Sequence, residues 1–194
     1  MGKKVQINDF RPEESKPSLK KEILMNSIYI LVVFIITFLI VEFVAQRTVV
    51  IGNSMKPTLS DRDNLIVDKI TYRFSDPKRF DVIVFPYQYE KDTFYIKRII
   101  GLPGETVRID ETGRIYINGK ELIENYGAEI INDPGLAIDD VVLGDDEYFV
   151  LGDNRNHSSD SRNPAVGKIK REIIIGKAWL RIYPFKEFGF VKHK

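Results

Sequence analysis

The sequence predicts a mainly β fold, an antiparallel β-sheet domain of barrel-like or sandwich form, preceded by one transmembrane helix. Three observations predict this fold class. One long apolar run lies near the N-terminus, and short segments rich in isoleucine, valine, tyrosine and phenylalanine recur after it. Asn118-Gly119 separates two of these segments, as the turn of a two-residue β-hairpin does.

The N-terminal part of the chain is expected to form a membrane anchor. Residues 1–22 are polar and predict a basic tail, whereas residues 23–41 contain only three polar side chains. A helix of that length, at about 1.5 Å per residue, approaches the hydrocarbon thickness of a bilayer. We expect a retained transmembrane helix over residues 23–45, because Phe43 spoils the small-residue pattern at which a signal peptide is cleaved.

The charge of the tail predicts the topology of the chain. Basic residues outnumber acidic ones in residues 1–22, which predicts a cytoplasmic N-terminus in a single-pass protein of the cell membrane. Residues 46–194 then lie on the outer face of the membrane, and they are enough for one β-rich domain.

Within that domain, strands are expected where β-branched and aromatic residues concentrate. The expected strands are residues 64–72, 81–89, 93–101, 114–117, 120–122, 147–151 and 173–183. Residues 124–146 are weakly patterned and contain Pro134-Gly135, so we expect a surface excursion there.

The composition excludes several classes of chemistry. Lysine and arginine number 29 against 28 acidic residues, so no global field favours nucleic acid. The chain has no cysteine, which excludes disulfides and thiol nucleophiles. Its two histidines, His157 and His193, are too few for a histidine-rich metal site. We therefore expect neither a metal nor a cofactor.

The first candidate for chemistry is Ser54, a few residues after the apolar run. Its surroundings fit neither of two common serine motifs: the second glycine of a nucleophile elbow is missing, and a Ser-x-x-Lys motif would need lysine where Pro57 stands. Lys56 is expected to point to solvent. His157 is a competing base for this serine, although no motif places a carboxylate beside it.

Lys97 is the second candidate. Side chains alternate along a strand, so Lys97 shares a face with Tyr95 and Ile99. Apolar neighbours disfavour the charged amine, and a fall of its pKa from about 10.4 toward about 7–8 would make it a general base. The alternative is that Lys97 reaches to solvent from a strand edge and has no role.

Three stretches together resemble, in order, three sequence boxes of the bacterial type I signal peptidases in their short, single-span form. They are Ser54-Met55-x-Pro57-Thr58, the run from Lys97 to Glu105 and the run from Gly152 to Arg162. Residues 80–85 resemble a fourth box, and the match extends from the anchor to about Asn163. The resemblance implies a β-rich serine endopeptidase with a Ser–Lys dyad, which removes signal peptides from secretory preproteins.

The resemblance also implies roles for single residues. Ser54 is expected to be the nucleophile and Lys97 the general base, with Ser158 orienting the lysine. Asp160 and Arg162 are expected to form a supporting ion pair with Arg155 nearby, although these three residues could instead only brace strands. Gly52 stands where some members carry a serine that binds the oxyanion. The oxyanion would then be bound by the Ser54 N–H and one further donor, either the Gly52 N–H or a water molecule.

We expect the substrate to bind as an added strand, with small residues at positions −1 and −3 from the cut. The expected lining residues are Val49, Val50, Ile51, Asn53, Phe94, Tyr95 and Ile96. The expected partners are preproteins and the phospholipid membrane, not nucleic acid.

Two other functions compete with this one. A self-cleaving repressor-like protease would carry a helix-turn-helix where this chain has its apolar run. A non-enzymatic membrane-tethered β domain would make the coincidence of Ser54, Lys97 and the polar loop, the run from Gly152 to Arg162, accidental.

Overall fold

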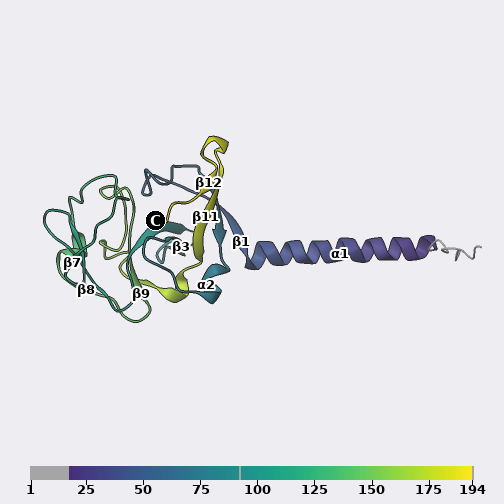
Figure 1. Ribbon diagram of the computed structural model, residues 1–194, viewed down its shortest axis with the longest axis horizontal. Coiled ribbons are helices and arrows are strands. Elements are labelled where there is room, and N and C mark those ends of the chain that lie inside the picture. Colours follow the sequence, from purple (N-terminus) through teal and green to yellow (C-terminus); the bar gives the residue numbers. More distant parts are fainter. Residues whose placement is uncertain (1–17, 92, 194) are drawn as a thin grey trace, which may run out of the picture. The chain divides into compact units, whose positions relative to one another are not determined.

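One long helix precedes a set of antiparallel strands in this computed structural model, which describes residues 18–91 and 93–193 (Figure 1). Helix α1 spans Leu19–Phe43, so it begins and ends slightly before the predicted span. By length and composition, its residues Leu19–Leu39 are able to cross a membrane. Most of the predicted basic tail, residues 1–17, lies outside the described residues. The chain divides into two units, residues 1–39 and residues 40–194, and the second is described by itself below.

The second unit consists of strands joined by loops and short helical turns. The strands are β1 (Ala45–Val49), β2 (Asn64–Asp68), β3 (Val82–Pro86), β4 (Phe94–Gly101), β5 (Thr106–Ile109), β6 (Ile115–Ile117), β7 (Lys120–Glu121), β8 (Val141–Val142), β9 (Glu147–Leu151), β10 (Ile169–Lys170), β11 (Gly176–Tyr183) and β12 (Gly189–Phe190). The short helices are α2 (Thr71–Phe74), η1 (Gly135–Ile138), η2 (Arg171–Ile173) and η3 (Phe185–Glu187).

The strands form two antiparallel sheets. The larger sheet has the order β1-β2-β11-β3-β4-β9-β10, with β12 paired to β11, and the smaller sheet has the order β7-β6-β5-β8. Figure 1 shows β7 and β8 at the opposite end of this unit from β11 and β12. The predicted antiparallel β fold after an N-terminal apolar helix is therefore confirmed.

The alternation of side chains along β4 connects the two sheets. Ile99 packs into one core cluster with Val150, whereas Ile100 packs on the other side with Val107 of the smaller sheet. Successive side chains of a strand point to opposite faces, so the part of β4 from Lys97 to Gly101 is covered on both faces. Polar residues in the middle of this strand are consequently removed from water.

The predicted hairpin turn is confirmed at Asn118-Gly119. Both residues have positive φ, 50° and 76°, which is the conformation that a two-residue turn between right-twisted strands requires. They connect β6 to β7, where Ile117 faces Lys120.

Some predicted strands are shorter than expected. The strand predicted over residues 64–72 ends at Asp68, whose carboxylate accepts the backbone N–H groups of Ile70 and Thr71 at 2.9 and 3.0 Å and so opens the short helix α2. The strand predicted over residues 81–89 ends at Pro86, and the strand predicted over residues 173–183 begins only at Gly176, because a 3₁₀ turn precedes it.

The prediction of a surface excursion over residues 124–146 is wrong in its central and last parts. Ile131, Ala137 and Leu143 are buried and belong to the core of the smaller sheet. Strand β8 in the same segment pairs with β5. The apolar residues of this segment are widely spaced and contact the core one at a time, so they form no periodic pattern.

Candidate active site

Ser54 lies in the serine loop, residues 50–63, which connects β1 to β2. The residues that anchor this loop are Met55 and Leu59, which are both buried and pack with Val50 in one apolar cluster. Gly52, two residues before the serine, has a φ of +92°, a conformation that residues with a side chain rarely adopt. The apolar anchors hold the backbone of the loop, and Ser54 lines a groove.

Lys97 reaches the Ser54 hydroxyl from β4. Its Nζ lies 2.9 Å from Ser54 Oγ and 3.1 Å from the carbonyl oxygen of Ile96. The residue is only 3% exposed, which is inconsistent with a lysine that extends into solvent. The centre of the Tyr95 ring lies 4.9 Å from Nζ, as expected for two residues on the same face of a strand.

Burial changes the acid–base chemistry of Lys97. Removal from water lowers its pKa to about 8, although the negative charges of Asp160 and Asp153 act in the opposite direction. A neutral amine has two N–H groups and one lone pair. One N–H donates to Ile96 O, which leaves the lone pair free to turn toward the Ser54 hydroxyl.

Ser158, which was expected to orient the lysine, makes no hydrogen bond to it. Its Oγ is buried and has no hydrogen-bond partner among the described residues. Gly152 shows how closely the segments pack here, because a Cβ on Gly152 would lie 2.5 Å from the carbonyl oxygen of Ser54 and would overlap Ser158 Oγ. Ser158 therefore lies near the Ser54 backbone, across a position that only glycine can occupy.

Two further contacts join the polar loop to the serine loop. The backbone N–H of Asn154 donates to Ser54 O at 3.0 Å, and its side-chain amide donates to Asn53 O at 3.1 Å. Because both carbonyl groups are held, the peptide planes before and after Ser54 are fixed relative to the polar loop.

Asp160 and Arg162 form an ion pair, as the resemblance implies. Arg162 donates Nε to Asp160 Oδ1 at 2.8 Å and Nη2 to Oδ2 at 2.9 Å, a bidentate arrangement with both side chains buried. Asp160 Oδ2 also accepts the backbone N–H of Gly152 at 3.1 Å. The pair therefore supports the glycine that packs against Ser54.

Arg155 contacts this pair only through its backbone. Its carbonyl oxygen accepts a hydrogen bond from Arg162 Nη2. Its side chain turns elsewhere, with Nη1 2.8 Å from Glu124 Oε1 and both side chains nearly buried. The Arg155 side chain therefore links the polar loop to Glu124 rather than to the dyad.

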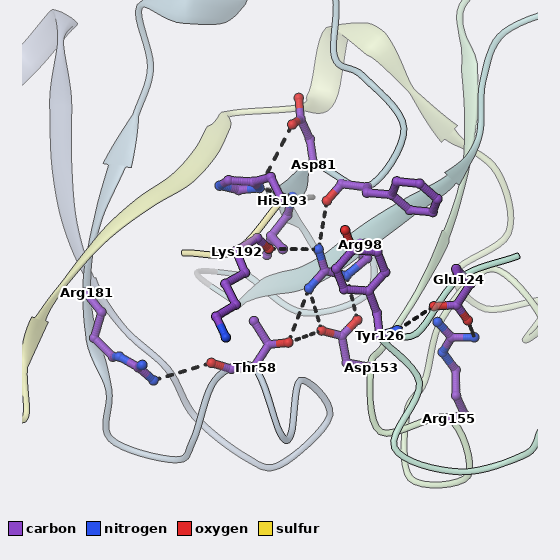
Figure 2. A network of polar contacts seen from close by, with 12 residues as sticks. Thr58, Asp81, Arg98, Glu124, Tyr126, Asp153, Arg155, Arg181, Lys192 and His193 are labelled. Carbon is purple, nitrogen blue, oxygen red and sulfur yellow. Dashed lines mark hydrogen bonds and ion pairs between the residues drawn. The ribbon is translucent and has the colours of Figure 1, made fainter. Parts of the chain in front are cut away.

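Arg98 is a buried residue of the site that the sequence analysis does not single out. It is 0% exposed, and its guanidinium donates Nε to Asp153 Oδ1 at 2.8 Å and Nη2 to Asp153 Oδ2 at 2.6 Å (Figure 2). Thr58 Oγ1, next to the same carboxylate, donates to Asp153 Oδ2 at 2.5 Å. The centre of the Tyr126 ring lies 3.8 Å from the guanidinium carbon.

This network connects both sides of the site. Arg98 follows Lys97 on β4, Asp153 follows Gly152 in the polar loop, and Thr58 belongs to the loop of Ser54. The sequence contains a signal for this network. Side chains alternate along a strand, so Arg98 lies on the face opposite Lys97, and an arginine buried there needs a hydrogen-bond acceptor.

The geometry narrows the choice of an oxyanion donor. The Gly52 N–H donates to Asp61 Oδ1 at 2.8 Å, so it is not available to a substrate. A Cβ on Gly52 would meet nothing within 4 Å, which means that space for a water molecule exists there. The Ser54 N–H donates to no other residue in the described part of the chain.

A groove of about 540 Å³ runs past Ser54 and Lys97. It is lined by all seven of the predicted residues, Val49, Val50, Ile51, Asn53, Phe94, Tyr95 and Ile96. Val50 differs from its neighbours because its side chain is buried in the cluster beneath, whereas Ile51 is 91% exposed.

The strand pairing shows what the two walls of the groove offer. Among the described residues, strand β1 pairs only with β2, so its other edge is free. The pairing of β4 with β9 begins at Arg98. Residues 94–97 of β4 therefore have no strand partner on the edge that faces β9, among the residues that the structure describes. Unpaired edges of this kind accept an extended peptide through main-chain hydrogen bonds.

His157 also lines the groove, but it makes no hydrogen bond with Ser54 among the described residues. Within the same residues, no group of three histidine, cysteine or acidic side chains is placed to hold a metal ion. The side chain that contacts Ser54 Oγ is that of Lys97.

A serine paired with a buried lysine, beside free strand edges of an antiparallel fold, is typical of a serine hydrolase that acts on peptides. Comparison with known proteins agrees, because the family model described as signal peptidase, peptidase S26, matches residues 22–183. The chain belongs to this family.

Individual relatives are similar over most of this chain. It is 44% identical to a probable signal peptidase I-2 of Synechocystis over 155 residues, which are 77% of this chain and 68% of the relative. It is 37% identical to a signal peptidase I of Bacillus amyloliquefaciens over 189 residues, 94% of this chain and 100% of the relative. A crystal structure of a signal peptidase I from Enterococcus faecalis is 34% identical, and the match covers 53% of this chain and 97% of that one, with a TM-score of 0.43.

Proposed function

We propose that this chain is a membrane-bound serine endopeptidase that cleaves N-terminal signal peptides from exported preproteins. The observation that carries the proposal is the 2.9 Å contact between the buried Nζ of Lys97 and Ser54 Oγ. The family supports the same activity, because relatives found by comparison are named signal peptidase I.

In the proposed mechanism the neutral amine of Lys97 takes the proton of the Ser54 hydroxyl as Oγ attacks the carbonyl carbon of the scissile bond. The carbonyl oxygen becomes an oxyanion, which the Ser54 N–H stabilises together with a water molecule admitted beside Gly52. The ammonium of Lys97 then gives its proton to the leaving amine, and an ester of Ser54 remains. A water molecule hydrolyses the ester, with Lys97 again accepting and returning the proton.

We further propose that the signal peptide binds as an extended strand between the edges of β1 and β4. Main-chain hydrogen bonds would supply affinity, and alternate side chains would enter the groove. Small residues at −1 and −3 fit this arrangement, because bulky side chains, among them Ile51, Phe94 and Tyr95, line the groove that contains Ser54.

The membrane orientation is part of the proposal. Helix α1 supplies one candidate span, and the basic residues before it favour a cytoplasmic N-terminus. The β unit would then act on the outer face of the cell membrane. Protease added to intact, wall-stripped cells should digest residues after Gln46, whereas protection of that region with cleavage of residues 1–22 would reverse the topology.

The competing functions are less well supported. A repressor-like protease would need a helix-turn-helix before the β unit, and the described residues there form the apolar helix α1. A non-enzymatic domain gives no reason for a lysine that is 3% exposed beside a serine hydroxyl.

The activity is tested by incubating the purified full chain, in detergent micelles, with a secretory preprotein. Mass spectrometry of the new N-terminus should show a single cut after a small residue at −1. The Ser54→Ala chain is the matched control. No cut by the parent chain, or an equal cut by the control, would refute the proposal.

A further inference from the structure

We infer that the segment Val191–His193 is a positioning element of the active site, which holds β3 and Arg98 and thereby the strand that carries Lys97. The inference rests on the proposed function. This segment lies beside β3 (Figure 1). Each of the three residues makes a separate contact.

Val191 packs in the core beneath the serine loop. It is buried in the same apolar cluster as Met55, the residue after Ser54, and Val82 of β3. Ile96, the residue before Lys97, packs against this cluster as well. Both members of the dyad are thus flanked by side chains that share a core with Val191, and close-packed cores transmit small displacements.

Lys192 contributes its backbone rather than its side chain. Its carbonyl oxygen accepts a hydrogen bond from Arg98 Nη1 at 3.0 Å (Figure 2). The carbonyl oxygen of Phe80 accepts a second hydrogen bond from the same nitrogen, at 2.8 Å. Nε donates to Asp153, and Nη2 donates to Asp153 and Thr58, so all three guanidinium nitrogens of Arg98 have partners. Without Lys192 O, one N–H of a fully buried cation would lack an acceptor.

His193 extends a strand ladder. The pairing of β11 with β3 ends at Lys177 and Ile83, so the N–H of Val82 lies just beyond the last pair. His193 Nδ1 accepts that N–H at 3.1 Å. Val82 is the residue that faces Arg98 in the pairing of β3 with β4. The imidazole therefore fixes β3 directly opposite Arg98.

The acceptor role requires a neutral imidazole. Burial lowers the pKa of His193 to about 4, and the positive charges of Lys177 and Arg98 act in the same direction, against the negative charge of Asp81. The imidazole is consequently neutral in the pH range in which Lys97 titrates.

Two substitutions separate the acceptor from the bulk of the side chain. His193→Asn places an amide oxygen near the position of Nδ1, whereas His193→Leu keeps the volume and removes the acceptor. We expect His193→Leu to lower kcat for preprotein cleavage by at least about tenfold with KM unchanged. The pH at which kcat/KM rises, as Lys97 loses its proton, should also shift by at least about half a pH unit. His193→Asn should remain within about threefold of the parent.

Ile109→Val, a core change in the smaller sheet, controls for lost stability because it lies in a cluster that contains none of these residues. All chains are assayed at full length in detergent micelles, with Tm measured in parallel. A parent-like kcat and pH profile for His193→Leu would overturn the inference. So would a loss in His193→Leu that Ile109→Val reproduces at the same fall in Tm, or an equal loss in His193→Asn.

If His193→Leu does not fold, Val191→Ala decides the question. It should lower kcat about threefold without raising KM, and a parent-like kcat would overturn the inference. The failure of this inference is distinct from that of the proposed function. In the first case the parent chain cleaves the preprotein and the variants cleave it equally well, and in the second the parent chain does not cleave it.

Discussion

The amine of Lys97 lies 2.9 Å from the hydroxyl of Ser54, although the two residues are 43 positions apart in the sequence. The lysine is the first residue of the buried part of β4, and the serine comes from a loop fixed by its apolar neighbours. The contact therefore joins an amine whose pKa is lowered by burial to a hydroxyl at the edge of a groove, and it underlies the predictions that follow.

The first prediction concerns the proposed nucleophile. Ser54→Ala removes one hydroxyl from a loop that is anchored by Met55 and Leu59, so the fold should persist and cleavage should cease. Preprotein cleavage measured by gel, with Tm for both chains, checks this outcome. Substantial turnover by the variant would mean that another residue attacks the substrate.

The second prediction concerns the charge on the proposed base. Lys97→Arg keeps a long cationic side chain but holds its proton at any working pH, so the variant should have no measurable cleavage. Circular dichroism should resemble that of the parent, which separates lost chemistry from lost structure. Activity retained in Lys97→Arg and lost in His157→Ala would replace the Ser–Lys pair by a Ser–His pair.

The third prediction concerns the packing of the polar loop. Gly152→Ala would place a methyl group 2.5 Å from Ser54 O and into Ser158, so the serine loop must move, and kcat should fall by at least about tenfold. Gly144→Ala is the matched control, because the three atoms nearest to its Cβ would all belong to the Glu147 side chain, at 3.2 Å or more. Equal kcat values for the two variants would show that the close approach at Gly152 has no effect on catalysis.

The fourth prediction concerns stability. Asp153→Ala leaves the guanidinium of Arg98, which is 0% exposed, without its carboxylate, and should lower the free energy of unfolding by about 3–5 kcal/mol. The Arg181–Glu187 pair is a control, because the Glu187 side chain is 52% exposed and Glu187→Ala should cost below about 1 kcal/mol. Urea titration of both chains measures the difference, and similar costs would contradict the structural role of the Arg98 pair.

Much of the fold could be predicted from local patterns. Alternation along residues 93–101 places Lys97 with Tyr95, and the positive φ angles at Asn118-Gly119 match the turn expected there. Such features depend on residues close together in the chain.

The contacts around Arg98 could not be predicted in the same way. Its partners Asp153 and Lys192 lie 55 and 94 residues away, and His193 reaches Val82 across 111 residues. Nothing in a local pattern tells which buried donor meets which acceptor once the sheets have folded together. The burial of residues 124–146 could not be predicted for a related reason, because their buried apolar side chains contact the core one at a time and form no periodic pattern.

The central claim is that Lys97, in its neutral form, takes the proton of Ser54, and the pH dependence of kcat/KM for preprotein cleavage tests it most directly. Burial lowers the pKa of Lys97 to about 8, and the amine acts as a base only when unprotonated, so kcat/KM should rise as the pH increases through about 8 and then level off. The rise should be the same in the parent chain and in His157→Ala. A rise that disappears in His157→Ala would contradict the account, because the base would then be the histidine.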